Sequence, residues 1–115
     1  MGVVSNRPAY GDRRRWARYP LNASIRVITG TAIIAARGIR MSESGICLFA
    51  VADLPIGTRI KVEFTSPRSG EPIGVYGTVC NRAVYLYGVK FLAENLEDQR
   101  RVAHLGDAFR RHSSR

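Results

Sequence analysis

Four arginines lie within six residues near the start of the 115-residue chain, in the segment DRRRWARYP at 12–20. Their charged side chains repel one another and are rarely buried, so a hydrophobic core does not explain them. Each guanidinium group is a planar fork of donors that fits phosphate oxygens and the O6 and N7 acceptors of guanine. Because Arg14 and Arg18 are four residues apart, both side chains can project from one side of the segment and clamp an anionic ligand.

A second polar segment, GIRMSESG at 38–45, can supply the opposite side of such a clamp. It lies between two apolar runs, and its last four residues, SESG, are typical of a tight turn. A glycine at the end of the turn leaves room for backbone to approach a ligand closely. The two segments together predict a binding site made of an arm and a turn.

The charge of the chain favours the same class of ligand. There are 18 Lys and Arg residues against nine Asp and Glu, a net charge of +9, and nearly all the basic residues are arginines. A surface that only keeps the protein soluble would use lysine as readily. Phosphate or nucleotide is therefore the favoured ligand class, with an ordinary basic surface as the alternative.

Catalytic and metal-binding patterns are lacking in the sequence. The acidic residues are scattered, and the glycines do not form a phosphate-binding loop of the known enzyme types, so we expect no enzyme. Cys47 and Cys80 are far apart, lie in apolar segments and have no CxxC pattern, which predicts free, buried thiols. His104 and His112 have no partners at ligand spacing and are expected to be exposed on a helix. We expect neither a metal nor a cofactor.

The elements that must position the arm and the turn are mostly short strands. Alternation of apolar and polar residues, with turn residues between the runs, predicts six strands and hence an all-β, antiparallel barrel. Gly38 is expected to mark a bulge, and the last two strands are expected to join around Asn81–Arg82. The expected strands are 21–29, 31–41, 46–51, 58–65, 73–81 and 83–92.

A helical period follows the last strand. Asn95 and Asp98 have the spacing of a helix cap, which predicts one C-terminal helix from Leu96 to about Arg111. Its apolar face should pack on the barrel. The residues expected on that face are Leu96, Val102, Leu105 and Phe109.

The predicted organisation is one domain with three parts: a flexible basic arm at 1–20, a barrel at 21–93, and a helix with a frayed tail at 94–115. No apolar run approaches the ~20 residues of a membrane span, and the first residues lack a secretory signal. We expect a cytoplasmic protein.

The order of these features resembles the PilZ domain family, whose bacterial members bind the second messenger cyclic di-GMP through an RxxxR motif and a (D/N)xSxxG motif. Arg14 and Arg18 match the first motif, and Ser42 and Gly45 match the second. Arg40 stands where the second motif has an acidic residue or an amide. The segments LPIGTRIKVEF and YGVKF also resemble the family, which implies a single PilZ-like domain at 12–111.

The resemblance implies roles for these residues. Arg14 and Arg18 would grip guanine and phosphate, Ser42 would hydrogen-bond the ligand, and Gly45 would let backbone approach it. Arg13 stands where family members with an additional arginine bind a stacked pair of nucleotides.

Arg40 has only donors, whereas the family residue at its position accepts hydrogen bonds from guanine. Arg40 can instead pair with a phosphate. Glu43 or Ser44 of the same turn is then a candidate for the missing acceptor.

Three functions follow. The first is a cyclic di-GMP receptor that relays the signal to a downstream protein as its arm becomes ordered. The second is a PilZ-like module that has lost nucleotide binding through Arg40 and acts by protein–protein interaction. The third is a basic barrel that binds RNA or single-stranded DNA, with Tyr76, Tyr85 and Tyr87 as a stacking platform. The arginines lie at the ends of the chain rather than along the strands, which makes nucleic acid the least favoured ligand.

Overall fold

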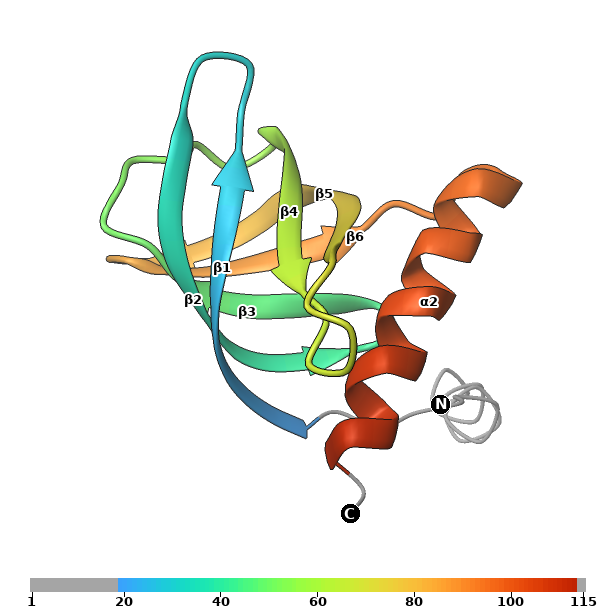
Figure 1. Ribbon diagram of the computed structural model, residues 1–115. Helices are drawn as coiled ribbons and strands as arrows, with labels where there is room; N and C mark the ends of the chain where they lie inside the picture. Colours follow the sequence, from blue (N-terminus) through green and yellow to red (C-terminus); the bar gives the residue numbers. More distant parts are fainter. Residues whose placement is uncertain (1–18, 114–115) are drawn as a thin grey trace, which may run out of the picture.

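The computed structural model describes the backbone of residues 19–113 and the side chains of residues 20–109 (Figure 1). It contains six strands and one long helix: β1 Tyr19–Ile28, β2 Ile33–Ser42, β3 Gly45–Phe49, β4 Arg59–Thr65, β5 Pro72–Ala83, β6 Leu86–Phe91 and α2 Leu96–Ser113. The arm predicted at 1–20 falls almost wholly outside the described residues.

The strands form a closed antiparallel barrel in the order β1-β2-β3-β6-β5-β4. The far end of β1 closes the barrel, because Val27 pairs with Ile34 of β2 on one side and with Val62 of β4 on the other. Through this short seam, neither β1 nor β4 is left wholly unpaired on one side. The predicted fold class, a six-stranded barrel with a C-terminal helix, is confirmed.

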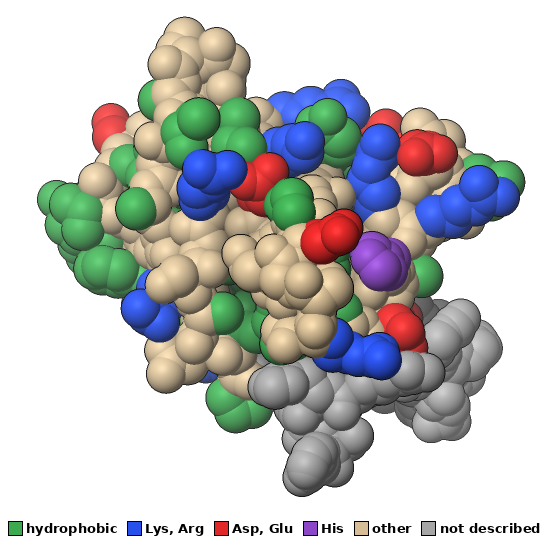
Figure 2. All heavy atoms as spheres, viewed as in Figure 1, with side chains coloured by type: hydrophobic (Ala, Val, Ile, Leu, Met, Phe, Trp, Pro, Cys, Tyr) green, Lys and Arg blue, Asp and Glu red, His purple; other side chains and the backbone are tan. Residues whose placement is uncertain are grey.

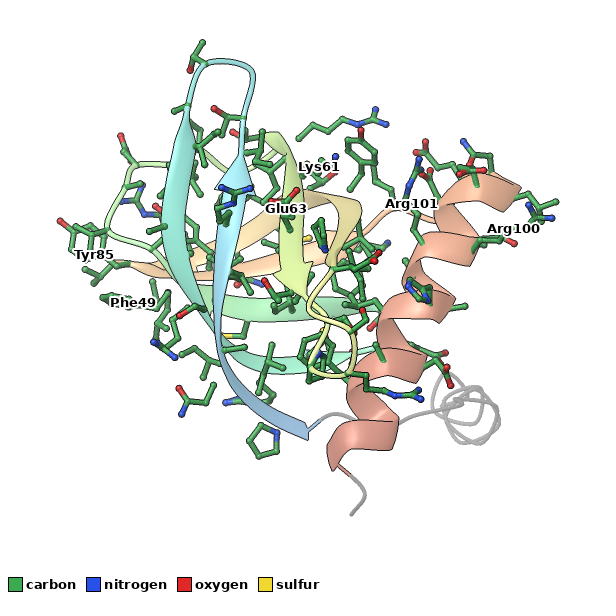
Figure 3. The ribbon with its side chains drawn as sticks, in the orientation of Figure 1. Phe49, Lys61, Glu63, Tyr85, Arg100 and Arg101 are labelled. Atoms are coloured by element: carbon green, nitrogen blue, oxygen red, sulfur yellow. The ribbon has the colours of Figure 1, made fainter. Side chains whose placement is uncertain are left out.

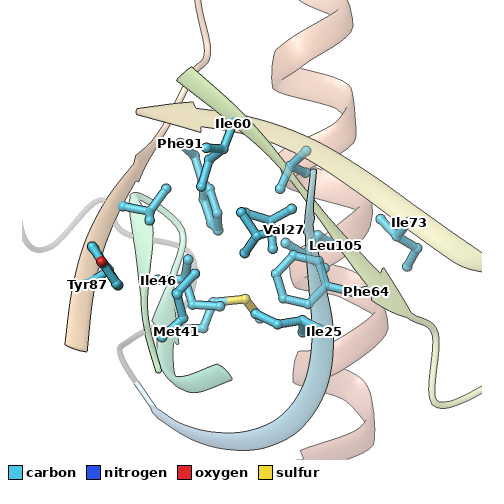
Figure 4. Packing of buried hydrophobic residues seen from close by; sticks show 14 of the residues in the cluster. Ile25, Val27, Met41, Ile46, Ile60, Phe64, Ile73, Tyr87, Phe91 and Leu105 are labelled. Atoms are coloured by element: carbon cyan, nitrogen blue, oxygen red, sulfur yellow. The ribbon is translucent and has the colours of Figure 1, made fainter. Parts of the chain in front are cut away.

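The period of two in the sequence decides which side chains fill the barrel. Along β4, Ile60, Val62 and Phe64 are buried, while the intervening Lys61 and Glu63 are partly exposed. Every strand contributes to the same interior in this way, and Figure 4 shows these apolar side chains meeting inside the barrel. The inward assignment of the β4 residues is therefore confirmed.

Helix α2 packs beside the barrel and begins at the predicted cap. The side-chain oxygen of Asn95 accepts a hydrogen bond from the Asp98 backbone nitrogen at 2.8 Å, which satisfies a free donor of the first turn. Phe109 is buried edge-on against Phe64, with ring centroids 5.7 Å apart. Leu96, however, is 61% exposed. It lies nine residues before the buried Leu105, about half a turn out of phase at 100° per residue, so its assignment to the buried face was wrong.

The β5–β6 hairpin is longer than expected. Its turn is at Val84–Tyr85, not at Asn81–Arg82, and the last pair of the ladder is Ala83 with Leu86. Val84 takes a φ of 59° although it is β-branched, so the turn lacks the usual Gly or Asn signal. Arg82 fixes this end, because its guanidinium pairs with Asp53 and donates to the Val84 carbonyl at 2.8 Å. The hydrogen bond to Asp53 raises the pKa of Arg82.

Two further expectations concern β2 and β3. The register of the β2–β3 ladder shifts between Gly38 and Arg40, which confirms the predicted bulge. A Cβ at position 38 would lie 2.5 Å from a methyl group of Leu21, so glycine also makes room for packing there. Strand β3 ends at Phe49, two residues before the expected end, and Val51 is 67% exposed.

Candidate ligand pocket

A pocket of about 420 Å³ opens on the outer wall of the barrel, beside the β2–β3 turn. It draws on four neighbouring strands. The described residues that line it are Arg40, Met41, Ser42, Ser44, Gly45, Ile46, Cys47, Cys80, Asn81, Gly88, Val89 and Lys90. Three of the sequence-predicted site residues, Arg40, Ser42 and Gly45, are therefore brought together at one pocket.

Strand register explains the composition of the pocket. Arg40 pairs with Cys47, Cys47 with Gly88, and Gly88 with Asn81, so these four residues form one row across β2, β3, β6 and β5. Side chains in such a row share a face of the sheet. The two central residues, Cys47 and Gly88, are small and form the floor of the pocket. The polar side chains of Arg40 and Asn81 lie at the two ends of the row.

A second row runs beside the first, formed by Ser42, Gly45, Lys90 and Thr78. The residues between the two rows point inward and are buried: Met41, Ile46, Val89 and Val79. The alternation that fills the core thus also determines which residues face the pocket.

The β2–β3 turn is fixed by its own hydrogen bonds. The Ser42 hydroxyl oxygen accepts a hydrogen bond from the Ser44 backbone nitrogen at 3.2 Å and lies 3.1 Å from the Ser44 hydroxyl. Ser42 is 8% exposed. The hydroxyls of both serines, which line the pocket, are therefore already engaged with each other.

Gly45 has a structural role in the barrel. A Cβ at this position would lie 2.2 Å from the carbonyl oxygen of Val89 on β6. Because that neighbour is backbone, a side chain at position 45 would push β3 and β6 apart. Glycine is required at position 45 because β3 and β6 approach each other closely there.

Two cations face the pocket with their donors unused. Arg40 and Lys90 are exposed, and neither side chain makes a hydrogen bond or an ion pair with a residue that the structure describes. Both groups only donate. An anion or a carbonyl-rich ring edge would satisfy them.

Eight lining residues were not predicted as site residues: Met41, Ile46, Cys47, Cys80, Asn81, Gly88, Val89 and Lys90. The expectation of buried thiols was wrong, since Cys80 is exposed and Cys47 is partly exposed. The ladder between β5 and β6 shifts register between Val79 and Asn81, and this bulge leaves Cys80 without a partner residue in β6. The sequence around Cys80 has the pattern of a regular strand and gives no signal of the bulge.

Asn81 leans across the floor of the pocket. A Cβ added to Gly88 would lie 2.4 Å from the Asn81 Oδ1 and 2.8 Å from its Nδ2. The amide group of Asn81 therefore occupies the space above Gly88. Only glycine at position 88 leaves room for that amide.

The other predicted site residues, Arg13, Arg14 and Arg18, lie outside the described residues. Within residues 20–109, no three His, Cys, Asp or Glu side chains gather as metal ligands, and no helix of the described chain is long and apolar enough to cross a membrane.

The three tyrosines of the proposed nucleic-acid platform do not form one surface. Tyr87 is fully buried, and Tyr76 lies beneath Lys61 and Arg101, whose charged groups are 5.8 and 5.5 Å from its ring centroid. Tyr85 lies at the hairpin turn against Phe49, away from α2 (Figure 3). On the face shown in Figure 2, basic side chains form separate groups with acidic ones between several of them.

Comparisons with known proteins agree on one fold. A family model described as the PilZ domain matches residues 12–106. Among curated proteins, no sequence matches this chain. A solved structure of the PilZ domain of CeSA, from a cellulose-synthesizing bacterium, has a TM-score of 0.69 at 17% identity, covering 84% of this chain and 99% of that one.

Two further solved structures are similar. The Bacillus subtilis inhibitor of motility, MotI/DgrA, has a TM-score of 0.65 at 12% identity, and the match covers 90% of this chain and 54% of that protein. The PilZ domain of YcgR from Escherichia coli, solved with c-di-GMP, has a TM-score of 0.61 at 13% identity, covering 89% and 95%. At these identities the likeness concerns the fold.

Proposed function

The chain belongs to the PilZ domain family, a family of c-di-GMP receptors, and we propose that it binds cyclic di-GMP in the pocket beside the β2–β3 turn. The single observation that carries the proposal is the convergence of Arg40, Ser42 and Gly45 on that pocket. They stand at the positions of the second motif, which Ser42 and Gly45 match and from which Arg40 departs, and all three line the same pocket.

The size and charge of the pocket support this ligand. Its volume of about 420 Å³ falls within the ~300–1,000 Å³ of small-molecule sites. The donors of Arg40 and Lys90, which have no partner among the described residues, suit a dianionic cyclic dinucleotide, since charge-assisted hydrogen bonds to phosphate are the strong ones. The small side chain of Cys47, in the middle of the first row, leaves room for a flat ligand between Arg40 and Asn81.

The arm completes the proposed site. Arg14 and Arg18 grip guanine and phosphate from the side opposite the barrel, and Arg13 allows a second, stacked ligand molecule. Binding orders the arm, and the ordered arm presents a changed surface to a downstream effector protein. The proposal gives the chain no catalytic step.

Calorimetric titration of the chain with cyclic di-GMP tests the proposal, since it yields affinity and stoichiometry together. We expect heat in the micromolar range or below for the wild type, and loss of at least tenfold in affinity for the Arg14→Ala, Arg18→Ala double variant. The matched control is Arg59→Ala, Arg68→Ala, which removes the same charge from exposed positions outside the pocket. Absence of heat from the wild type at high micromolar ligand would overturn the proposal and favour the nucleotide-independent module.

A further inference from the structure

The pocket offers many donors and few acceptors. Arg40 and Lys90 only donate hydrogen bonds. The Watson–Crick edge of guanine carries donors of its own, at N1 and at the N2 amino group. A site that selects guanine therefore needs an acceptor that faces these groups, because donors left without a partner in a bound ligand lower its affinity.

The β2–β3 turn does not supply that acceptor freely. Glu43 is not among the residues that line the pocket. Ser44 lines it, but its hydroxyl is engaged with Ser42. Among the described lining residues, Asn81 alone has a side-chain carbonyl oxygen.

Asn81 is also placed for this task. It ends the row that begins at Arg40, so the two side chains flank the floor formed by Cys47 and Gly88. Its amide lies over Gly88, since its Oδ1 would be only 2.4 Å from a Cβ added at that position. The amide makes no hydrogen bond with any described residue, which leaves its carbonyl and amino groups available.

We propose that Asn81 is a specificity-determining residue that accepts a hydrogen bond from the guanine N1 or N2 group, in place of the acceptor that Arg40 removes from the motif. The inference rests on the proposed function. The motif has its acceptor at the position of Arg40 on β2, whereas the proposed acceptor of this chain lies on β5, on the other side of the pocket floor. Arg40 is thereby free to pair with a phosphate oxygen.

The test is a calorimetric comparison of Asn81→Ala and Asn81→Asp with cyclic di-GMP. Alanine removes the acceptor, and we expect the affinity to fall about five- to tenfold, the effect of one lost hydrogen bond. Aspartate keeps the acceptor, and its affinity should stay within about threefold of the wild type. Thr65→Ala is the matched control, since Thr65 is an exposed polar residue of β4 that belongs to neither outward row and does not line the pocket, and the affinity of this variant should not change.

Gly88→Ala provides a second route to the same answer. The added Cβ displaces the Asn81 amide without removing it, so this variant should also lose affinity. Each variant is checked by its thermal unfolding midpoint, since Asn81 is exposed and its loss should not unfold the barrel.

The outcomes separate the two proposals. A wild type that does not bind overturns the proposed function and the inference with it. A wild type that binds, with Asn81→Ala at the same affinity or with Asn81→Asp as weak as Asn81→Ala, overturns only the role of Asn81.

Discussion

Tyr87 of β6 joins the barrel wall to the loop between β3 and β4: its buried hydroxyl accepts a hydrogen bond from the Leu54 backbone nitrogen at 3.0 Å and donates one to the Ala52 carbonyl. The ring is fully buried. One tyrosine thus satisfies two backbone groups of a connection, at 50–58, that has no strand of its own.

Replacing Tyr87 by phenylalanine should therefore destabilise the barrel. The ring remains, but the buried Leu54 donor and the partly buried Ala52 acceptor lose their partner, which costs about 1–3 kcal/mol in free energy of unfolding. Urea unfolding followed by circular dichroism measures the difference. Tyr85→Phe is the control, because Tyr85 is 40% exposed and its hydroxyl makes no hydrogen bond with a described residue; equal stability of the two variants would contradict this interpretation.

Gly45→Ala should destabilise the fold, whatever its effect on a ligand. The new Cβ meets the Val89 carbonyl at 2.2 Å, so backbone must move, at a cost of about 1–3 kcal/mol. Gly30→Ala is the matched control, since nothing lies within 4 Å of a Cβ there. The unfolding midpoints of the two variants are compared, and only that of Gly45→Ala should fall. An unchanged midpoint for Gly45→Ala would show that β3 and β6 are not in such close contact.

Arg40→Met should weaken cyclic di-GMP binding by about three- to tenfold, because the charge-assisted contact to phosphate is lost and methionine adds no amide or carboxylate acceptor in its place. It should also make the affinity less sensitive to salt, since one exposed cation of the pocket is gone. Titrations at low and high ionic strength give both quantities. Arg59→Met removes the same charge outside the pocket, and a salt response equal to that of Arg40→Met would argue against a phosphate contact at Arg40.

Cys80 should report on occupancy of the pocket. It is exposed on the bulge of β5, whereas Cys47 is only partly exposed, so Cys80 should react faster with a thiol reagent. Cyclic di-GMP should slow that reaction by covering the thiol. Spectroscopic thiol titration of the wild type, with Cys80→Ser to identify the faster phase, measures both effects. Labelling of Cys80 at the same rate with saturating ligand would place the ligand elsewhere.

The fold follows from local patterns in the sequence. The alternation of Ile60, Val62 and Phe64 predicts an amphipathic strand, and Asn95 predicts the helix start, because each signal lies within a few residues. The turn at 42–45 is predictable for the same reason. The hairpin end at Val84–Tyr85 is not, since neither residue type indicates a turn.

The far wall of the pocket could not be predicted in this way. Asn81, Gly88 and Lys90 face Arg40 and Ser42 only through the pairing of strands that are distant in sequence. A one-residue bulge at Cys80 changes which side chains face outward. Residue types along β5 and β6 do not encode that register.

The two outward rows cross four of the six strands, and this arrangement exists only while the barrel is closed. An unfolded chain disperses the same residues and has no comparable affinity for a ligand. Any molecule that occupies the pocket therefore adds its binding free energy to that of folding, about 2.7 kcal/mol at a concentration of one hundred times Kd. The cellular level of the ligand would then help to set how long each copy of the protein survives proteolysis.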